Sequence, residues 1–205
     1  MATAGGVAFL VPQRWSCHKV NLNPVGAGCE ALMIILTPAG ENAKTFKLCT
    51  MYNHPGHHIS PKFITHLKAY QFKGKSLPML FVGDLNSPHH AFGSRLTNEF
   101  GSSLLQVMNS ENLILLNNSK EPTYFSSATG QSNLIDLVIS DIEMNSLITS
   151  CVVSGDISSD HLPVVTTLDF KIQQNPKRSV NTKQWAVNLD SELSKFEISD
   201  DIDRD

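Results

Sequence analysis

Apolar residues in the first 170 positions gather in short runs, and polar, turn-forming segments separate these runs. Apolar runs of about four to eight residues are typical of strands, and runs without alternation are typical of strands buried on both faces. In residues 45–51 the side chains alternate, with Phe46 and Leu48 on one side and Cys49 and Met51 on the other. We predict strands at residues 7–11, 31–36, 45–51, 79–82, 113–116, 134–139 and 162–168.

Two segments have the spacing of helices. In residues 60–72, Ser60 is a suitable N-cap, Pro61 occupies the first helical position, and apolar residues recur on one face. Residues 97–109 also place their apolar side chains on one face. Because strands dominate and do not alternate regularly with helices, the sequence predicts an α+β fold of two packed sheets with helices outside.

The pattern fades after residue 172. We expect a domain at residues 1–172 and a polar linker and tail at 173–205, with a short amphipathic helix at 185–198. No apolar run approaches the roughly 20 residues that a membrane-spanning helix needs. With 41% hydrophobic and 17% charged residues, the composition excludes a disordered or collagen-like chain.

Charge and cysteines narrow the choice further. A net charge of −3 is unlike that of a DNA-coating protein. Residues 42–83 nevertheless contain six lysines and no acid, which indicates either a phosphate-binding face or an ordinary solvated surface. The four cysteines form no CxxC pair, so we expect reduced thiols and no zinc site built from them.

Side chains that can carry chemistry follow the predicted strands. Asp84 and Asn86 come after the apolar run 79–82, and their spacing of two places them on the same side of an extended chain. An acid and an amide in this position can hold a water molecule and a phosphoryl oxygen. Asp, Asn, Ser and Pro are also turn formers, so an ordinary turn is the alternative.

Asp136 interrupts an apolar strand, where an unpaired carboxylate costs several kcal/mol. His161, in a turn-compatible Ser-Asp-His sequence before the last strand, is its best partner on chemical grounds. An aspartate that keeps a histidine protonated would create an acid facing a phosphate. The alternatives are a solvent-facing aspartate on an edge strand and a histidine satisfied within the core.

Tyr52 ends the strand at 45–51, and its hydroxyl can donate to a phosphate. The histidines that follow it, at 54, 57 and 58, allow zinc as an alternative, but no helix carries them and no acid lies nearby in the sequence. Aspartates brought together at the strand ends would repel one another without a cation, and oxygen ligands favour Mg²⁺ or Mn²⁺. The chemistry implied is metal-assisted attack of water on a phosphodiester.

The ordered motifs GDLNSPHH, PTYFS, NLIDLVIS and SSDHLPV resemble the endonuclease/exonuclease/phosphatase superfamily. The resemblance covers about residues 5–170 and is strongest to the apurinic-type endonuclease domain of jockey-like non-LTR retrotransposons. It implies a four-layer αββα sandwich of mainly antiparallel sheets. It also implies Mg²⁺ or Mn²⁺ as cofactor, DNA as substrate, and a reverse transcriptase domain in the parent polyprotein.

The resemblance also implies roles for individual residues. Asp84 would activate the attacking water, and Asn86 would contact the scissile phosphate and the nucleophile. Tyr52 would bind phosphate. Asp136 would support His161 in catalysis. Asp160 would join Asp84 at the metal.

In members of this superfamily, a strand, a helix and a second strand ending in a metal-binding glutamate precede the GGVAFLVP-like segment. Here that segment begins at residue 5, so we expect these elements to be missing and metal affinity to be weakened. Three functions follow as expectations: a DNA-nicking endonuclease for target-primed reverse transcription, a small-substrate phosphatase, and an inactive remnant. The first would act inside the cell, in the nucleus.

Overall fold

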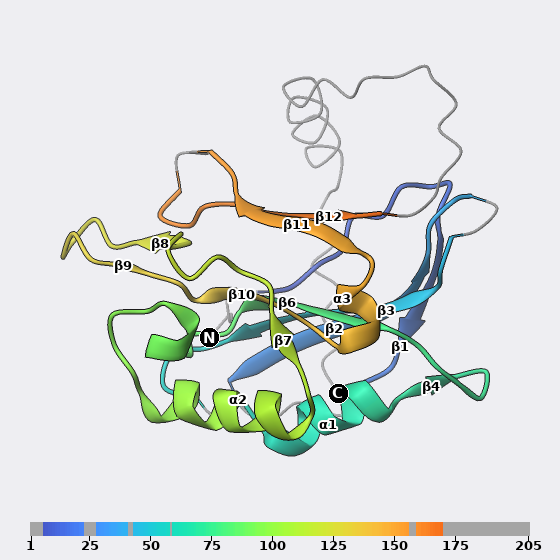
Figure 1. Cartoon of the computed structure of the whole chain (residues 1–205), viewed down its shortest axis with the longest axis horizontal. Coiled ribbons are helices and arrows are strands. Elements are labelled where there is room, and N and C mark those ends of the chain that lie inside the picture. The colour runs from blue at the N-terminus through green and yellow to red at the C-terminus, as the bar shows by residue number, and fades with distance from the viewer. Residues whose placement is uncertain (1–5, 23–27, 41–42, 58, 156–158, 170–205) are drawn as a thin grey trace, which may run out of the picture. The chain divides into compact units, whose positions relative to one another are not determined.

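A six-stranded mixed sheet organises the computed structural model, which describes residues 6–22, 28–40, 43–57, 59–155 and 159–169. The strand order is β1-β2-β3-β6-β10-β7, and β3 and β6 are parallel while the other neighbours are antiparallel (Figure 1). The strands are β1 (Ser16–Val20), β2 (Cys29–Thr37), β3 (Phe46–Asn53), β6 (Met79–Asp84), β10 (Asp136–Ser140) and β7 (Ile114–Leu115).

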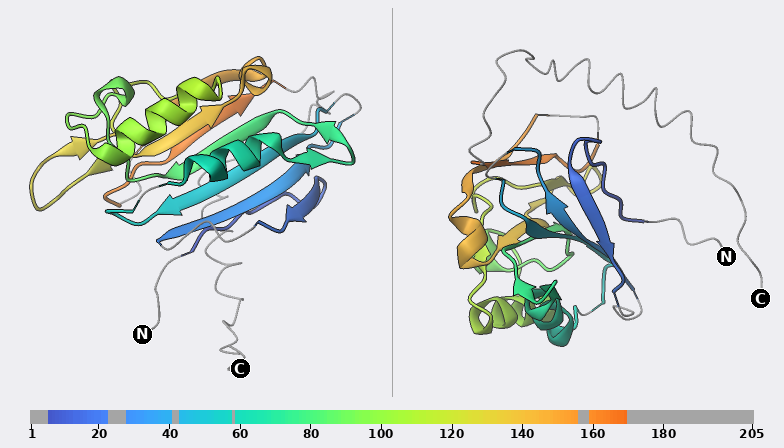
Figure 2. Two further views of the ribbon diagram at one scale, coloured as in Figure 1. Left: turned by 90° about the horizontal axis from the view of Figure 1, so that it is seen from below. Right: turned by 90° about the vertical axis from the view of Figure 1, so that its right-hand side faces the viewer.

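Helices α1 (Pro61–Ala69) and α2 (Glu99–Ser110) lie side by side across one face of this sheet, as Figure 2 shows from below. Pro61 stands at the start of α1, as predicted, but Ser60 makes no side-chain cap bond. The buried face of α1 packs on the sheet through Phe63, Ile64 and Leu67. Apolar burial of this kind, about 25 cal/mol per Å², holds the helices in place.

The opposite face of the sheet packs against a second, two-stranded sheet of β11 (Ile148–Val153) and β12 (Val164–Leu168). Their common core contains Phe46, Leu80 and Val138 from the large sheet and Val164 and Leu168 from β12. The short helix α3 (Ile142–Asn145) joins β10 to β11. The predicted α+β sandwich of two sheets with outer helices is thus confirmed, with the described helix layer on the side of α1 and α2.

The alternation predicted for residues 45–51 is confirmed. Phe46 and Leu48 of β3 face the core between the sheets, whereas Cys49 and Met51 face the helices. Lys47 shares the helix side and is 1% exposed. Its Nζ donates to the carbonyl oxygens at the C-terminal end of α1, at 3.1 Å from Leu67 and 2.5 Å from Lys68.

Several sequence predictions need correction. Residues 7–11 form no strand, although Phe9 and Val11 pack partly buried against the inter-sheet core. Strand β1 was not predicted, because four of its five residues are exposed and apolar periodicity is lacking. Nor did the sequence predict β11 or the short hairpins β4–β5 (Gln71–Phe72, Lys75–Ser76) and β8–β9 (Tyr124–Phe125, Ser132–Asn133).

Two of the lysines in residues 42–83 are engaged within the chain. Lys47 is buried, and Lys68 pairs with Glu111 of the segment after α2. Lys44 precedes β3, and Lys75 belongs to β5 in the hairpin that precedes β6.

Contacts within the chain divide it into Met1–Ile172 and Gln173–Asp205. The predicted linker and the helix at 185–198 lie outside the described residues, so the domain boundary stays a prediction. In the described part of the chain no helix is long and apolar enough to cross a membrane.

Candidate active site

The polar residues predicted to carry chemistry gather where β6 ends and β10 begins. Because these strands are antiparallel, Asp84 at the end of β6 stands directly opposite Asp136 at the start of β10. Side chains of directly opposed residues lie on the same face of a sheet, so the two carboxylates share one side. The pairing register of β6 and β10 therefore brings together two aspartates that are far apart in sequence.

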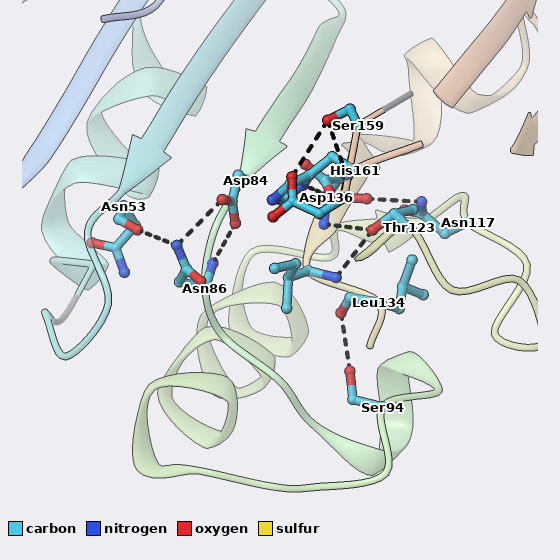
Figure 3. Close-up of polar contacts among 12 residues, drawn as sticks. Asn53, Asp84, Asn86, Ser94, Asn117, Thr123, Leu134, Asp136, Ser159 and His161 are labelled. Atoms are coloured by element: carbon cyan, nitrogen blue, oxygen red, sulfur yellow. Dashed lines mark hydrogen bonds and ion pairs between the residues drawn. The ribbon is translucent and has the colours of Figure 1, made fainter. Parts of the chain in front are cut away.

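His161 completes this arrangement. Its Nδ1 lies 2.9 Å from Oδ2 of Asp136, which confirms the pairing inferred from the position of the aspartate in an apolar strand (Figure 3). An isolated β-bridge joins the backbones of Tyr124 and His161 and holds the histidine in position, and the centroids of the two rings are 4.9 Å apart. Nδ1 carries a proton both in the neutral tautomer that donates to Asp136 and in the imidazolium. Nε2 is then an acceptor in the neutral ring and a donor in the imidazolium.

Thr123 fixes the backbone on both sides of this pair. Its Oγ1 accepts from the backbone N–H of Asp136 at 3.1 Å and of Ile135 at 3.3 Å. Its carbonyl accepts from the N–H of Leu162 at 2.7 Å, directly after His161. Thr123 is fully buried, so these bonds form in a low-dielectric setting where they are stronger than in water.

Asn86 is held in an uncommon backbone conformation, with φ at 44°. Asn tolerates this left-handed region better than most residues. Its backbone N–H donates to Oδ1 of Asp84 at 3.1 Å, and its Nδ2 donates to Oδ2 of Asp84 at 3.3 Å and to the carbonyl of Asn53 at 2.8 Å. The predicted same-side placement of Asp84 and Asn86 is therefore produced by a turn, and the turn is part of the site.

Gly83 allows β6 to approach β3 closely just before Asp84. Its φ is 151°, and a Cβ at this position would lie 1.9 Å from the carbonyl oxygen of Met51. Any larger residue would push the two strands apart. The Gly-Asp sequence thus fixes where Asp84 leaves the sheet.

The electrostatics of the site follow from this crowding. Burial, and after it the neighbouring charge of Asp136, raise the pKa of Asp84 to about 6, against the opposing effects of the hydrogen bonds from Asn86 and the charge of His161. Burial alone would lower the pKa of His161. The hydrogen bond and charge of Asp136, with the charges of Asp84 and Asp160, outweigh burial and raise the pKa of His161 above its ordinary value.

A cavity of about 410 Å³ opens over these groups. Tyr52, Asp84, Asn86 and His161 line it together, so four of the predicted residues face one space. The remaining lining comes from Pro55, Gly56, Pro88, Asn98, Tyr124, Asn133 and Ile135. A larger cavity of about 500 Å³ lies beside α1 and contains none of the predicted site residues.

Two predicted residues stand somewhat apart. Tyr52 lies in the cavity wall, with its ring 4.7 Å from that of His54, and His54 pairs with Glu30 at 3.3 Å. Asp160 is exposed, and its backbone carbonyl accepts from the N–H of Phe125 at 2.8 Å. The assignment of Asp160 as a metal ligand stays a prediction.

Asp84, Asp136 and His161 can offer ligand atoms that all lie within 4.8 Å of one another. Among the described residues no other group of three acids, histidines or cysteines does so, and the turn that holds His54 and His57 is not part of one. Two carboxylates that oppose each other suit a hard divalent cation, since the cation relieves their repulsion. This donor set therefore fits a divalent metal ion.

The sequence analysis missed the residues that hydrogen-bond to the backbone next to the site residues. Thr123 and Asn117 bind the backbone around Asp136, and Asn53 binds the segment around Asn86. Each is an uncharged polar residue near a strand end, and Thr123 and Asn53 are fully buried whereas Asn117 is partly buried. One sequence does not distinguish such a residue from an ordinary turn former.

The family model described as endonuclease–reverse transcriptase matches residues 46–165. Among solved structures, the endonuclease domain of TRAS1, a telomere-specific non-LTR retrotransposon, is similar with 17% identity and a TM-score of 0.59. The match covers 79% of this chain and 82% of that domain, and shows a common fold.

Two further solved structures show weaker similarity. A 3'-5' exonuclease from Neisseria meningitidis is 14% identical, covers 67% of this chain and 65% of its own, and has a TM-score of 0.48. An AP endonuclease from Leishmania major is 11% identical, covers 65% and 53%, and has a TM-score of 0.44. No curated protein sequence matches significantly. Since the family model spans more than half of it, the chain belongs to the endonuclease–reverse transcriptase family of the endonuclease/exonuclease/phosphatase superfamily.

Proposed function

We propose that this chain is the endonuclease domain of a non-LTR retrotransposon and nicks DNA by metal-dependent hydrolysis of a phosphodiester. The nick would provide the primer end for a reverse transcriptase domain of the same polyprotein, and the reaction would take place in the nucleus. The observation that carries the proposal is the cavity lined by Asp84, Asn86 and His161, with the Asp136 carboxylate hydrogen-bonded to His161 beside it.

In this proposal His161 acts on the scissile phosphate. The Asp136 carboxylate holds Nδ1, so the ring keeps a fixed orientation, and its raised pKa keeps the imidazolium to a higher pH than in an ordinary histidine. A cation beside the phosphate stabilises the negative charge that grows in the transition state. Tyr52 lines the same cavity and would donate its hydroxyl to a phosphate oxygen.

Asp84 is the candidate general base. With a pKa of about 6 it is largely ionised at neutral pH, yet basic enough to accept a proton from an attacking water. Asn86 lies within hydrogen-bond distance of Asp84 and lines the cavity, so its amide would orient the water against the phosphate.

Asp84 and Asp136 would hold Mg²⁺ or Mn²⁺, with Asp160 as a further predicted ligand. The bound cation would polarise the phosphate and neutralise charge in the transition state. Since the described site then offers a cation only two carboxylates, because the imidazolium of His161 has no free lone pair, we propose that affinity for the cation is weak.

The test is relaxation of supercoiled plasmid by the full chain in Mg²⁺ or Mn²⁺, with Asp84→Ala as control. The proposal expects open circles from the unmutated chain and none from the variant. Release of phosphate from an inositol phosphate without plasmid nicking would instead favour the small-substrate phosphatase. Silence on both substrates, in a chain that is folded by circular dichroism, would favour an inactive remnant.

A further inference from the structure

The loop of residues 84–87, which carries Asp84 and Asn86, is hydrogen-bonded to the sheet through the buried side-chain amide of Asn53. Asn53, the last residue of β3, has no exposed surface. Its Nδ2 donates to the carbonyl of Leu85 at 3.1 Å and to the carbonyl of His57 at 2.8 Å, and the thiol of Cys29 donates to its Oδ1 at 2.8 Å. Every side-chain hydrogen-bonding atom of Asn53 therefore has a partner.

The backbone of the same residue reaches the site directly. The carbonyl oxygen of Asn53 accepts from Nδ2 of Asn86 at 2.8 Å, and Asn86 lies between Asn53 and Asp84 in Figure 3. Both N–H groups of Asn86 Nδ2 are thus used in hydrogen bonds to Asn53 and Asp84. Among the described residues none donates to Oδ1 of Asn86, and this atom is available to a ligand in the cavity that Asn86 lines.

We infer that Asn53 is a positioning residue that sets the orientation of the Asn86 amide in the candidate active site. The inference rests on the proposed function for its catalytic consequence. Its structural part, the coupling of Asn53 to Asn86, stands on the hydrogen bonds themselves.

The coupling runs through adjacent residues. Leu85 is fully buried and precedes Asn86, and its carbonyl is held by Nδ2 of Asn53 and by the hydroxyl of Ser87. Without the Asn53 amide the carbonyl loses one of two donors, and that of His57 loses the donor that closes the turn of residues 53–57. Since Asn86 is in a left-handed conformation, relaxation of this loop would rotate its amide away from the phosphate position.

The sharpest test is a double-mutant cycle measured by plasmid nicking under single-turnover conditions. We expect Asn53→Ala to lower the rate constant about tenfold with less than a twofold change in the DNA concentration at half-maximal rate. In a chain that already carries Asn86→Ala, the same substitution should change the rate less than twofold. Equal losses in both backgrounds would overturn the inference, because Asn53 would then act without Asn86.

Cys49→Ala is the matched control for lost packing. Cys49 is as buried as Asn53, belongs to the same strand, and bonds only to the carbonyl of Thr50 next to it. It should lower the melting temperature and leave the rate of the folded protein unchanged. The milder Cys29→Val removes the donor to Asn53 and should slow nicking about twofold to threefold if the Asn53 orientation matters. An unchanged rate with Asn53→Ala would overturn the inference.

A measurement without catalysis separates this inference from the proposed function. In protein labelled with ¹⁵N at asparagine, the side-chain amide signal of Asn86 is identified by its loss in Asn86→Ala. Asn53→Ala should move this signal toward the position of a solvated amide, even if the chain nicks no DNA. An unmoved signal would refute the coupling, whereas a moved signal in an inactive chain would refute only the proposed function.

Discussion

Asp84 and Asp136 face each other across the antiparallel pair of β6 and β10, at the one place in the described sheet where two carboxylates oppose each other in register. Like charges opposite each other destabilise a sheet. The repulsion adds to the burial that raises the pKa of Asp84 to about 6. A folded chain thus holds this arrangement at a cost in stability, and a bound cation would relieve that cost.

Replacing Asp84 with Asn should separate stability from activity. The substitution removes a charge that burial and Asp136 both disfavour, so we expect the metal-free protein to melt about 2–4 °C higher at pH 7.5. The same change should abolish nicking in Mn²⁺. Thermal unfolding followed by circular dichroism at pH 7.5 and pH 5 measures the first effect.

The pH dependence gives the control for this prediction. Because the folded-state pKa of Asp84 is raised above its value of 3.8 in the unfolded chain, its carboxylate reduces stability as the pH rises toward and through about 6. The advantage of Asp84→Asn should therefore shrink at pH 5. A variant that melts below the parent at pH 7.5 would contradict the repulsion between the two aspartates.

Metal binding should compete with protons at Asp84. Below about pH 6 the carboxyl is mostly protonated, so the apparent affinity for Mn²⁺ should fall by up to about tenfold per pH unit. Calorimetric titration at pH 5, 6 and 7.5 measures this. Near pH 6 two buffers of different ionisation enthalpy should also reveal proton release on binding. Equal affinity at pH 5 and pH 7.5 would exclude Asp84 as a ligand.

Asp136→Asn tests the pair with His161. The partner carboxylate raises the pKa of His161, so we expect the histidine to titrate at a lower pH in the variant, as followed by its ring proton signals in NMR. The stabilisation from the pair is present below the ordinary histidine pKa and is lost as the pH rises through the raised value. The variant should therefore lose more stability at pH 6 than at pH 9, and nicking should fall at least about 100-fold.

The control for this variant is His161→Asn, which removes the titrating ring and should abolish the pH-dependent part of the loss. If His161 titrates at the same pH with and without the Asp136 carboxylate, the short contact between them has no electrostatic consequence. The proposed role of the imidazolium would then fail.

Much of the site could be predicted from one sequence because strand periodicity and burial constrain it. Asp136 in an apolar strand required a partner, and His161 is that partner at 2.9 Å. The placement of Asp84 and Asn86 at the end of β6 followed from the end of an apolar run. The first inference needs only the rule that a charge in an apolar setting requires a partner. The second needs only the position at which the apolar run ends.

Other features depend on contacts between distant residues, and local patterns do not contain them. Strand β1 pairs with β2 along its whole length but has only one buried residue, Val20, so its sequence carries no apolar signal. Residues 7–11 have that signal and form no strand. Lys47 belongs to a lysine-rich segment that resembles a solvated surface, yet it is fully buried because α1 ends above it and offers carbonyl acceptors.

Lys47→Met should therefore affect folding and leave the chemistry alone. Methionine keeps most of the aliphatic length but cannot donate to the carbonyls of Leu67, Lys68 and Tyr70 at the end of α1. Each carbonyl left without a donor costs about 1–3 kcal/mol of stability. Part of this loss is offset because the substitution also removes the ammonium of Lys47, whose pKa burial lowers. We expect a net loss of about 1–2 kcal/mol in the free energy of unfolding, measured with urea. Lys62→Met, on the exposed face of the same helix, should change it by less than about 0.5 kcal/mol. Equal stability of the two variants would show that Lys47 does not cap α1, and a lower nicking rate in folded Lys47→Met would show that the cap also reaches the site.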